Sequence, residues 1–208
     1  MIAIVDYGVG NLYSLRCSLK AIGQEALVTP DPAEILRADR VILPGVGAFG
    51  DAADKLRKTG LDAAVTAAAA AGKPLMGICL GMQLLFETGF EYGVHRGLGL
   101  LKGQVRPMRE WIDPTLKIPQ MGWNGLRIRK NNPLLSGVRE GDCVYFVHSY
   151  AAVGCEESLL ADVDYGGTIT ACVGKDNVYG CQFHPEKSGE VGLRILRAFC
   201  ELKGGRMA

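Results

Sequence analysis

A cysteine between two glycines is the part of the sequence best suited to covalent chemistry. Cys79 stands in Gly77-Ile-Cys-Leu-Gly81, directly after a short apolar run that predicts a buried strand. Small residues two positions before and after a nucleophile are what a tight strand–turn–helix elbow requires. Such an elbow would lift the sulfur above the sheet edge, at a helix N-terminus, and leave the amide of Leu80 free to bind an oxyanion.

A catalytic thiol also needs a base, because an ordinary cysteine is only a few per cent thiolate at neutral pH. Of three histidines, His184 lies in Gln182-Phe-His-Pro-Glu186, where the last apolar run ends. Pro185 keeps His184 out of helical geometry, and in an extended segment Glu186 points to the same side. The pattern predicts a Cys79–His184–Glu186 triad in which the carboxylate orients the imidazole. The alternative is a loop histidine paired with Glu186 at the surface.

The elements that would position these residues alternate between strands and helices. Apolar runs predict strands at 2–5, 26–29, 41–43, 74–78 and 178–183, and helical periodicity follows at 12–22, from 51, at 63–71, at 80–86 and at 191–202. Short apolar strands alternating with helices indicate a parallel sheet covered on both faces. Cys79 and His184 then fall at the carboxyl ends of strands, where ligands bind in such sheets.

The middle of the chain has a different pattern. From about 97 to 170 there is no convincing helix, and strand-like runs occur at 126–129, 143–147, 159–163 and 169–173. We expect these runs to form an antiparallel section that extends the sheet. Since there is no linker or repeat, residues 1–208 are expected to form one α/β domain.

Composition excludes several other classes of protein. The chain of 208 residues is 48% hydrophobic and 22% charged, with a net charge of +1, and it has no basic cluster that would bind nucleic acid. It has no apolar run of the ~20 residues that span a bilayer and no basic leader, so neither a membrane partner nor secretion is expected. Seven cysteines without a C-x-x-C pair argue against disulfides or bound metal and for the reducing cytoplasm.

One glycine-rich loop matches a cofactor-binding pattern. Gly45-Val-Gly-Ala-Phe-Gly50 fits the dinucleotide fingerprint G-x-G-x-x-G. That fingerprint needs an acidic residue ~20 positions later, at the end of the next strand, to hold the ribose. Here the next strand ends at Ile78-Cys79, without a carboxylate, and the loop follows the third strand rather than the first. We therefore expect no cofactor, although the glycines indicate that something approaches this backbone closely.

Six segments, taken in order along the chain, resemble a known family. They are 6–11 (DYGVGN), 44–50 (PGVGAFG), 77–83 (GICLGMQ), 122–124 (GWN), 145–150 (YFVHSY) and 183–188 (FHPEKS). The segments 77–83 and 183–188 resemble the two signatures of the class I, or triad, glutamine amidotransferases. All six together are similar to the glutaminase subunits of imidazole glycerol phosphate synthases, enzymes of histidine biosynthesis. The resemblance spans nearly the whole chain and implies a flavodoxin-like open, mainly parallel sheet with helices on both faces.

The resemblance implies a role for each matching residue. Cys79 would attack the side-chain amide of L-glutamine and form a thioester, His184 would pass a proton to the departing ammonia, and Glu186 would orient His184. The backbone amides of Gly47 and Leu80 would form the oxyanion hole. The remaining substrate-binding residues would be Gln83, His148, Ser149 and Tyr150.

The resemblance also implies a partner. Ammonia released into neutral water is mostly ammonium, which is not a nucleophile, so a biosynthetic glutaminase gains by delivering it directly to a synthase. The implied synthase is a (β/α)₈ cyclase subunit, joined in a heterodimer, that makes imidazole glycerol phosphate and aminoimidazole carboxamide ribotide. The isolated glutaminase subunit is expected to be a poor enzyme. Trp123, Asn124 and Asn11 are candidate interface residues, with core packing as the alternative for Trp123.

Two positions depart from the family pattern: Gln120 stands where histidine is common and Ala151 where an aromatic residue is frequent. Neither touches the triad, so they concern partner contact or gating. Three other functions compete with this interpretation: a glutaminase serving another synthase (for pyridoxal phosphate, purine or anthranilate), a non-catalytic scaffold subunit, and a stand-alone thiol hydrolase or chaperone-like relative on a similar sheet. Segments 6–11 and 122–124 argue against the first, and the intact triad argues against the second.

Overall fold

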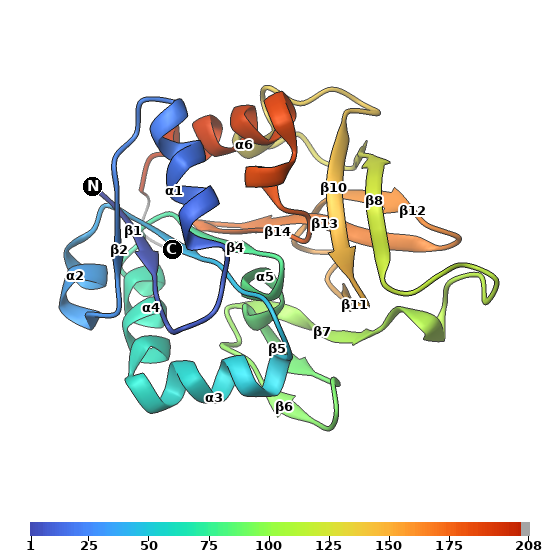
Figure 1. Ribbon diagram of the computed structural model, residues 1–208, viewed down its shortest axis with the longest axis horizontal. Helices are drawn as coiled ribbons and strands as arrows, with labels where there is room; N and C mark the ends of the chain where they lie inside the picture. The colour runs from blue at the N-terminus through green and yellow to red at the C-terminus, as the bar shows by residue number, and fades with distance from the viewer. Residues whose placement is uncertain (205–208) are drawn as a thin grey trace.

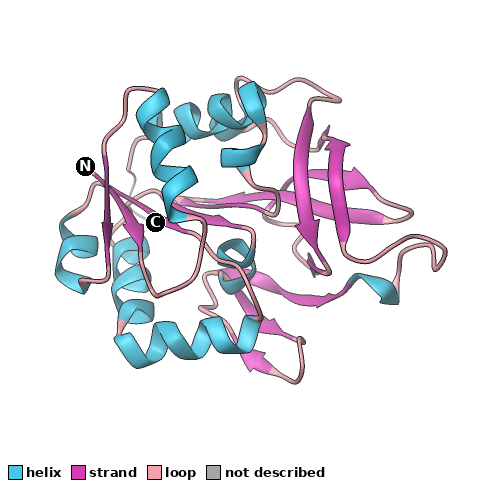
Figure 2. Ribbon diagram, in the orientation of Figure 1, coloured by secondary structure: helices cyan, strands magenta, loops and turns pink. Residues whose placement is uncertain are grey.

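The main sheet of the protein has eight strands. The computed structural model describes residues 1–204, and its main sheet has the strand order β2-β1-β3-β4-β14-β13-β12-β9 (Figures 1 and 2). The bounds are β1 Ile2–Val5, β2 Ala26–Thr29, β3 Arg40–Leu43, β4 Leu75–Ile78, β14 Val178–Cys181, β13 Thr168–Lys175, β12 Leu159–Asp164 and β9 Arg127–Ile128. The first five strands are parallel, in the order typical of flavodoxin-like sheets, and the last three add antiparallel pairs.

Helices cover both faces of the parallel strands (Figure 1). One face carries α1 (Leu12–Ala21) and α6 (Gly189–Glu201); the other carries α2 (Pro32–Arg37), α3 (Phe49–Thr59) and α4 (Leu61–Ala70). Successive residues of a strand face opposite sides, so Ile4 of β1 packs in the first core and Val5 in the second. Strands buried on both faces therefore read as the continuous apolar runs of the sequence. No helix within residues 1–204 has the length and apolar character needed to span a bilayer.

Most of the expected elements of the parallel part are confirmed, with two differences. The sequence pattern does not predict α2, a six-residue helix in which the Asp31 carboxylate accepts the N–H of Ala33 (2.8 Å). The expected helix 80–86 is too long: α5 spans Leu80–Leu84, and Phe86 begins β5 (Phe86–Gly89). The N–H groups of Leu98 and Leu100 donate to the carbonyls of Leu84 and Leu85 (both 2.8 Å). These carbonyls therefore have partners from another segment in place of the N–H groups of a further helical turn.

The expectation that the whole middle section extends the main sheet is wrong. Strands β9, β12 and β13 do extend it, but two further sheets form beside it. One pairs β8 (Gln120–Gly125) with β10 (Cys143–His148), and the other has the order β11 (Tyr150–Val153), β7 (Leu101–Pro107), β5, β6 (His95–Arg96). Within residues 97–170 the helical structure is confined to two 3₁₀ turns, Met108–Glu110 and Pro133–Leu135.

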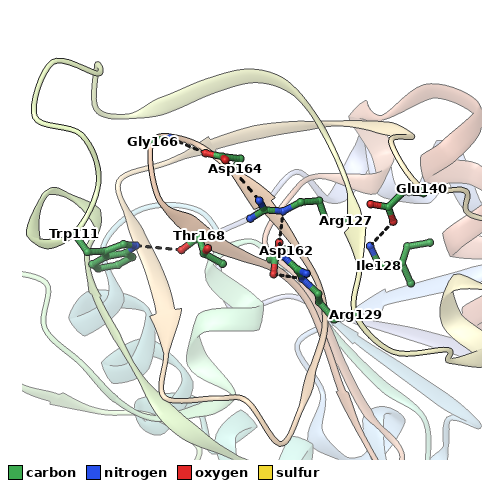
Figure 3. A network of polar contacts seen from close by, with 9 residues as sticks. All are labelled: Trp111, Arg127, Ile128, Arg129, Glu140, Asp162, Asp164, Gly166 and Thr168. Atoms are coloured by element: carbon green, nitrogen blue, oxygen red, sulfur yellow. Dashed lines mark hydrogen bonds and ion pairs between the residues drawn. The ribbon is translucent and has the colours of Figure 1, made fainter.

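A buried charge holds the antiparallel end of the main sheet together (Figure 3). The Asp162 side chain of β12 is 2% exposed, and its two oxygens accept from Nε of Arg127 (2.7 Å) and Nε of Arg129 (2.6 Å). Both arginines come from the edge strand β9 or the residue after it. A carboxylate this deeply buried is tolerated because two guanidinium groups neutralise it, and removing any one partner would be costly.

Candidate active site

Cys79 occupies a strained turn between β4 and α5. Its φ of 54° and ψ of −114° lie outside the regions that residues with side chains usually adopt. The turn needs both neighbouring glycines, because a Cβ on Gly77 would lie 2.6 Å from the carbonyl oxygen of Gly81, and one on Gly81 only 1.8 Å from that of Leu43. The N–H of Cys79 donates to the Cys181 carbonyl of β14 (2.7 Å). The structure thus contains the elbow that the glycine spacing predicts.

His184 lies just beyond the end of the neighbouring strand, β14, and its backbone is fixed from two sides. Its N–H donates to the carbonyl of Tyr145 in β10 (3.0 Å). Its carbonyl accepts the Ser188 hydroxyl (2.6 Å), whose oxygen in turn accepts the N–H of Tyr145 (3.0 Å). These contacts hold the imidazole between the main sheet and the β8–β10 sheet.

The structure brings the three predicted triad residues together. Nδ1 of His184 lies 2.9 Å from Oε1 of Glu186, and both side chains are almost fully buried. Burial disfavours the charged imidazole, but hydrogen bonds to Cys79 and Glu186 and their charges outweigh this and raise the pKa of His184 to about 9. The His184 imidazolium is therefore the favoured form at neutral pH, within hydrogen-bonding reach of the sulfur.

A cavity of about 390 Å³ opens over the sulfur. Eight of the nine predicted site residues line it: Gly47, Cys79, Leu80, Gln83, His148, Ser149, Tyr150 and His184. The ninth, Glu186, lies behind the His184 ring. The other residues that line the cavity are Val46, Glu91, Pro119 and Val147. The volume suits a small polar molecule.

The loop with the dinucleotide-like pattern packs directly on the elbow. A Cβ on Gly45 would lie 2.7 Å from the backbone nitrogen of Gly81 and 2.7 Å from the Tyr7 hydroxyl. That hydroxyl donates to the Pro44 carbonyl (2.8 Å), and burial raises the pKa of Tyr7, so it remains a donor. Gly47 has a φ of +98°, a conformation that favours glycine. The loop is thereby held beside Cys79.

Two backbone N–H groups at the cavity wall are free to bind an anion. Among residues 1–204, Gly47 donates its N–H to no other group of the chain. Leu80 is the first residue of α5, where a helix supplies no partner for the N–H. Both residues line the cavity together with Cys79.

Hydrogen bonds to the Tyr150 carbonyl determine which atoms of Gln83 and His148 are donors in the cavity wall. The Tyr150 carbonyl accepts from Nε2 of Gln83 (2.9 Å) and lies 2.9 Å from Nδ1 of His148. Burial lowers the pKa of His148 to about 4, so the ring is neutral and its Nδ1 carries the proton toward Tyr150. The Nε2 atom of His148 is then an acceptor, buried and without a partner among the described residues.

Three further residues of this region are not among those predicted from the sequence. Glu91 lies in the turn between β5 and β6, lines the cavity, and accepts the N–H of Phe49 at the start of α3 (2.7 Å). Tyr7 supports the Gly45 loop, and Gln182 is buried beside the sulfur. Tyr7 and Gln182 belong to the motif segments 6–11 and 182–186, whereas no local pattern singles out Glu91.

The candidate interface residues lie mainly on the β8–β10 sheet. Trp123 is 55% exposed, so the core-packing alternative is wrong, and its ring meets that of Tyr145 edge-on with centroids 6.0 Å apart. Asn124 and Asn11 are half-buried. Both departures from the family pattern are fully buried: Gln120 donates to Oδ1 of Asn124 (2.9 Å), and Ala151 lies in the core.

Comparison with known proteins agrees with this geometry. The family model of the class-I glutamine amidotransferases matches residues 3–202. A protein of Wolinella succinogenes named imidazole glycerol phosphate synthase subunit HisH is 50% identical over 97% of this chain and 100% of its own length. The protein of the same name from Bacillus licheniformis is 52% identical over 96% of this chain and 95% of its own.

Two solved structures share the fold at lower identity. A structure of PurLQS from Thermotoga maritima has a TM-score of 0.75 and 22% identity, covering 96% of each chain. A structure described as a glutamine amidotransferase has a TM-score of 0.74 and 20% identity, covering 96% of this chain and 97% of the other. The expected flavodoxin-like fold is thereby confirmed.

Proposed function

Since the chain belongs to the class-I glutamine amidotransferase family, we propose that the cavity over Cys79 is the glutaminase site of an imidazole glycerol phosphate synthase. The chain is half identical to subunits of that name over nearly its full length. One observation carries the assignment: the strained Cys79 lies beside a buried His184, whose Nδ1 is 2.9 Å from Glu186. That arrangement activates a thiol for acyl transfer.

The first half of the reaction makes the thioester. The Cys79 thiolate attacks the side-chain carbonyl carbon of L-glutamine, and the N–H groups of Gly47 and Leu80 bind the oxyanion that forms. The His184 imidazolium then gives its proton to the amide nitrogen, the C–N bond breaks, and ammonia leaves.

The second half restores the enzyme. Neutral His184 takes a proton from water, whose oxygen attacks the thioester. The C–S bond breaks, releasing glutamate, and the Cys79 thiolate faces the His184 imidazolium again. Glu186 keeps the imidazole in the correct orientation through both halves and stabilises its charged form.

Substrate recognition follows from the polarity of the walls. Glu91 offers a carboxylate for the α-ammonium group of glutamine. Oε1 of Gln83 and Nε2 of His148 offer acceptors, and Ser149 offers a hydroxyl. A ligand with one cationic end and one amide end matches this set.

The partner is a (β/α)₈ cyclase that consumes the ammonia. The two subunits form a heterodimer in the cytoplasm, and residues 1–208 of this chain form one domain of it. The exposed side chains Met121 and Trp123 offer an apolar contact on β8. Val147, opposite Met121 in the neighbouring strand, lines the cavity, so this face lies next to the reaction site. No bound cofactor or metal takes part in the proposed reaction.

Labelling with a glutamine-analogue chloroketone tests the assignment. The reagent is expected to modify Cys79 and to be blocked by L-glutamine, while Cys17 and Cys143, which are exposed, remain unmodified. Peptide mass spectrometry identifies the site. Preferential labelling of Cys17 or Cys143, or labelling that L-glutamine does not reduce, would contradict the proposed glutaminase.

A further inference from the structure

A buried amide side chain touches the nucleophile and takes no part in the mechanism above. Gln182 lies between the end of β14 and His184, and it is fully buried. Its Nε2 is 3.8 Å from Sγ of Cys79, and its Oε1 is 3.0 Å from Nε2 of Gln83. A buried polar group of this kind has a defined set of partners, and its orientation decides what it contributes to the site.

The direction of these hydrogen bonds follows from a single backbone group. The carbonyl of Tyr150 can only accept, so Gln83 must turn its NH₂ group, rather than its oxygen, toward it (2.9 Å). The second hydrogen of that NH₂ group points at Gln182, which must therefore present its oxygen to Gln83. The NH₂ group of Gln182 is left facing the sulfur. The amide orientations are thus set by the network and do not depend on distinguishing nitrogen from oxygen by position.

We propose that Gln182 is a further catalytic residue, which donates a hydrogen bond from its side-chain amide to the Cys79 sulfur. The inference rests on the proposed glutaminase function and adds a donor to that site. A thiolate accepts hydrogen bonds better than a neutral thiol does, so the contact favours the reactive form of Cys79. It also fixes the direction in which the sulfur points, because Gln182 is held in turn by Gln83 and Tyr150.

A purely structural role for Gln182 makes a different prediction. In that case the side chain only satisfies the buried NH₂ group of Gln83. Gln182→Glu separates the two roles, because a carboxylate has nearly the same size and still accepts from Gln83, but offers the sulfur no donor. Gln182→Met fills a similar volume and removes both hydrogen bonds.

The rate at which iodoacetamide alkylates Cys79 measures the donor role directly, since this reagent reacts with the thiolate and needs no glutamine. In the full chain at pH 7.5, we expect Gln182→Met to slow the reaction about tenfold and Gln182→Glu to slow it more, as expected for the loss of a hydrogen bond to a charged group. With the cyclase present, kcat for glutamine should fall about as much while KM changes less than about threefold.

A matched control is Asn177→Asp, which changes another buried amide to a carboxylate. Asn177 donates to the carbonyls of Ala69 and Lys73, away from the cavity, so this variant should leave the alkylation rate unchanged. Alkylation of folded Gln182→Glu at the wild-type rate would overturn the proposal, as would a loss confined to KM. Should Gln182→Glu fail to fold, Gln182→Met decides by the same criteria. Failure of the glutaminase proposal itself would appear separately, as wild-type protein that releases no glutamate even in the complex with the cyclase.

Discussion

The parallel part of the main sheet and the antiparallel part of the molecule contribute to the site in different ways. In the parallel part, the site is made by backbone: a strained turn at Cys79 and a glycine loop packed against it. In the antiparallel part it is made by side chains, such as His148 at the end of β10 and Glu91 in the turn before β6, and the Asp162 network joins β12 to the edge strand β9 nearby. The comparison indicates that changes in the first part should alter the rate of chemistry, and changes in the second should alter stability or binding.

The largest effect is expected at the base that follows the last parallel strand. His184→Asn removes the proton donor for the leaving ammonia, so kcat/KM for glutamine in the complex should fall about 10³- to 10⁴-fold. A glutamate-release assay measures this. His95→Asn is the control, because His95 does not line the cavity, and it should retain activity within about threefold. A fall in kcat/KM of less than tenfold in His184→Asn would show that His184 is not the proton donor of the reaction.

The second largest effect is expected from removing the buried charge of the antiparallel part. Asp162→Asn leaves Arg127 and Arg129 facing a neutral group, and the free energy of unfolding should fall by about 3 to 5 kcal/mol in urea titrations. The alkylation rate of Cys79 in the folded variant should equal that of wild type. The control is Glu157→Gln, which breaks an exposed pair with Lys175 and should leave unfolding unchanged. The comparison fails if Asp162→Asn lowers reactivity but not stability.

The pH dependence of stability gives a smaller effect. Folding raises the pKa of His184 from an ordinary 6.5 to about 9, so its contribution is fully present below pH 6.5 and is lost as pH rises through about 9. The free energy of unfolding should therefore drop by up to about 3 kcal/mol over this range. Glu186→Gln removes one stabilising partner of the imidazolium and should make the drop smaller. Equal drops in both proteins, measured by urea unfolding at each pH, would contradict this assignment.

The smallest effect is expected at the exposed face of β8. Trp123→Ala should weaken binding of the cyclase by about 2 kcal/mol, the size of an interface hot spot, and leave unfolding of the isolated chain unchanged because the ring is mostly exposed. Calorimetric titration measures the affinity. Tyr92→Ala, at an 88% exposed position outside this sheet, is the control. Unchanged affinity of the Trp123→Ala variant for the cyclase would show that the interface lies on another face of the molecule.

The same contrast explains what could be predicted from the sequence. The elbow at Cys79 and the approach of His184 follow from local patterns, since one apolar run ends just before each of these residues and adjacent parallel strands end at one edge of the sheet. Glu91 could not be found in this way, because it sits beside a two-residue strand that has no periodicity. The role of Gln182 depends on hydrogen-bond directions that start at Tyr150, 32 positions earlier in the chain. The partners of Asp162 depend on antiparallel register, which no local pattern fixes.

In the proposed function, Cys79 supplies ammonia from glutamine to a separate synthase site. The most direct test is Cys79→Ala in the complex with the cyclase, assayed for imidazole glycerol phosphate formation first with glutamine and then with an ammonium salt. We expect glutamine-dependent synthesis to be lost while ammonium-dependent synthesis stays at the wild-type rate. Synthesis that continues with glutamine, or that fails equally with ammonium, would contradict the account.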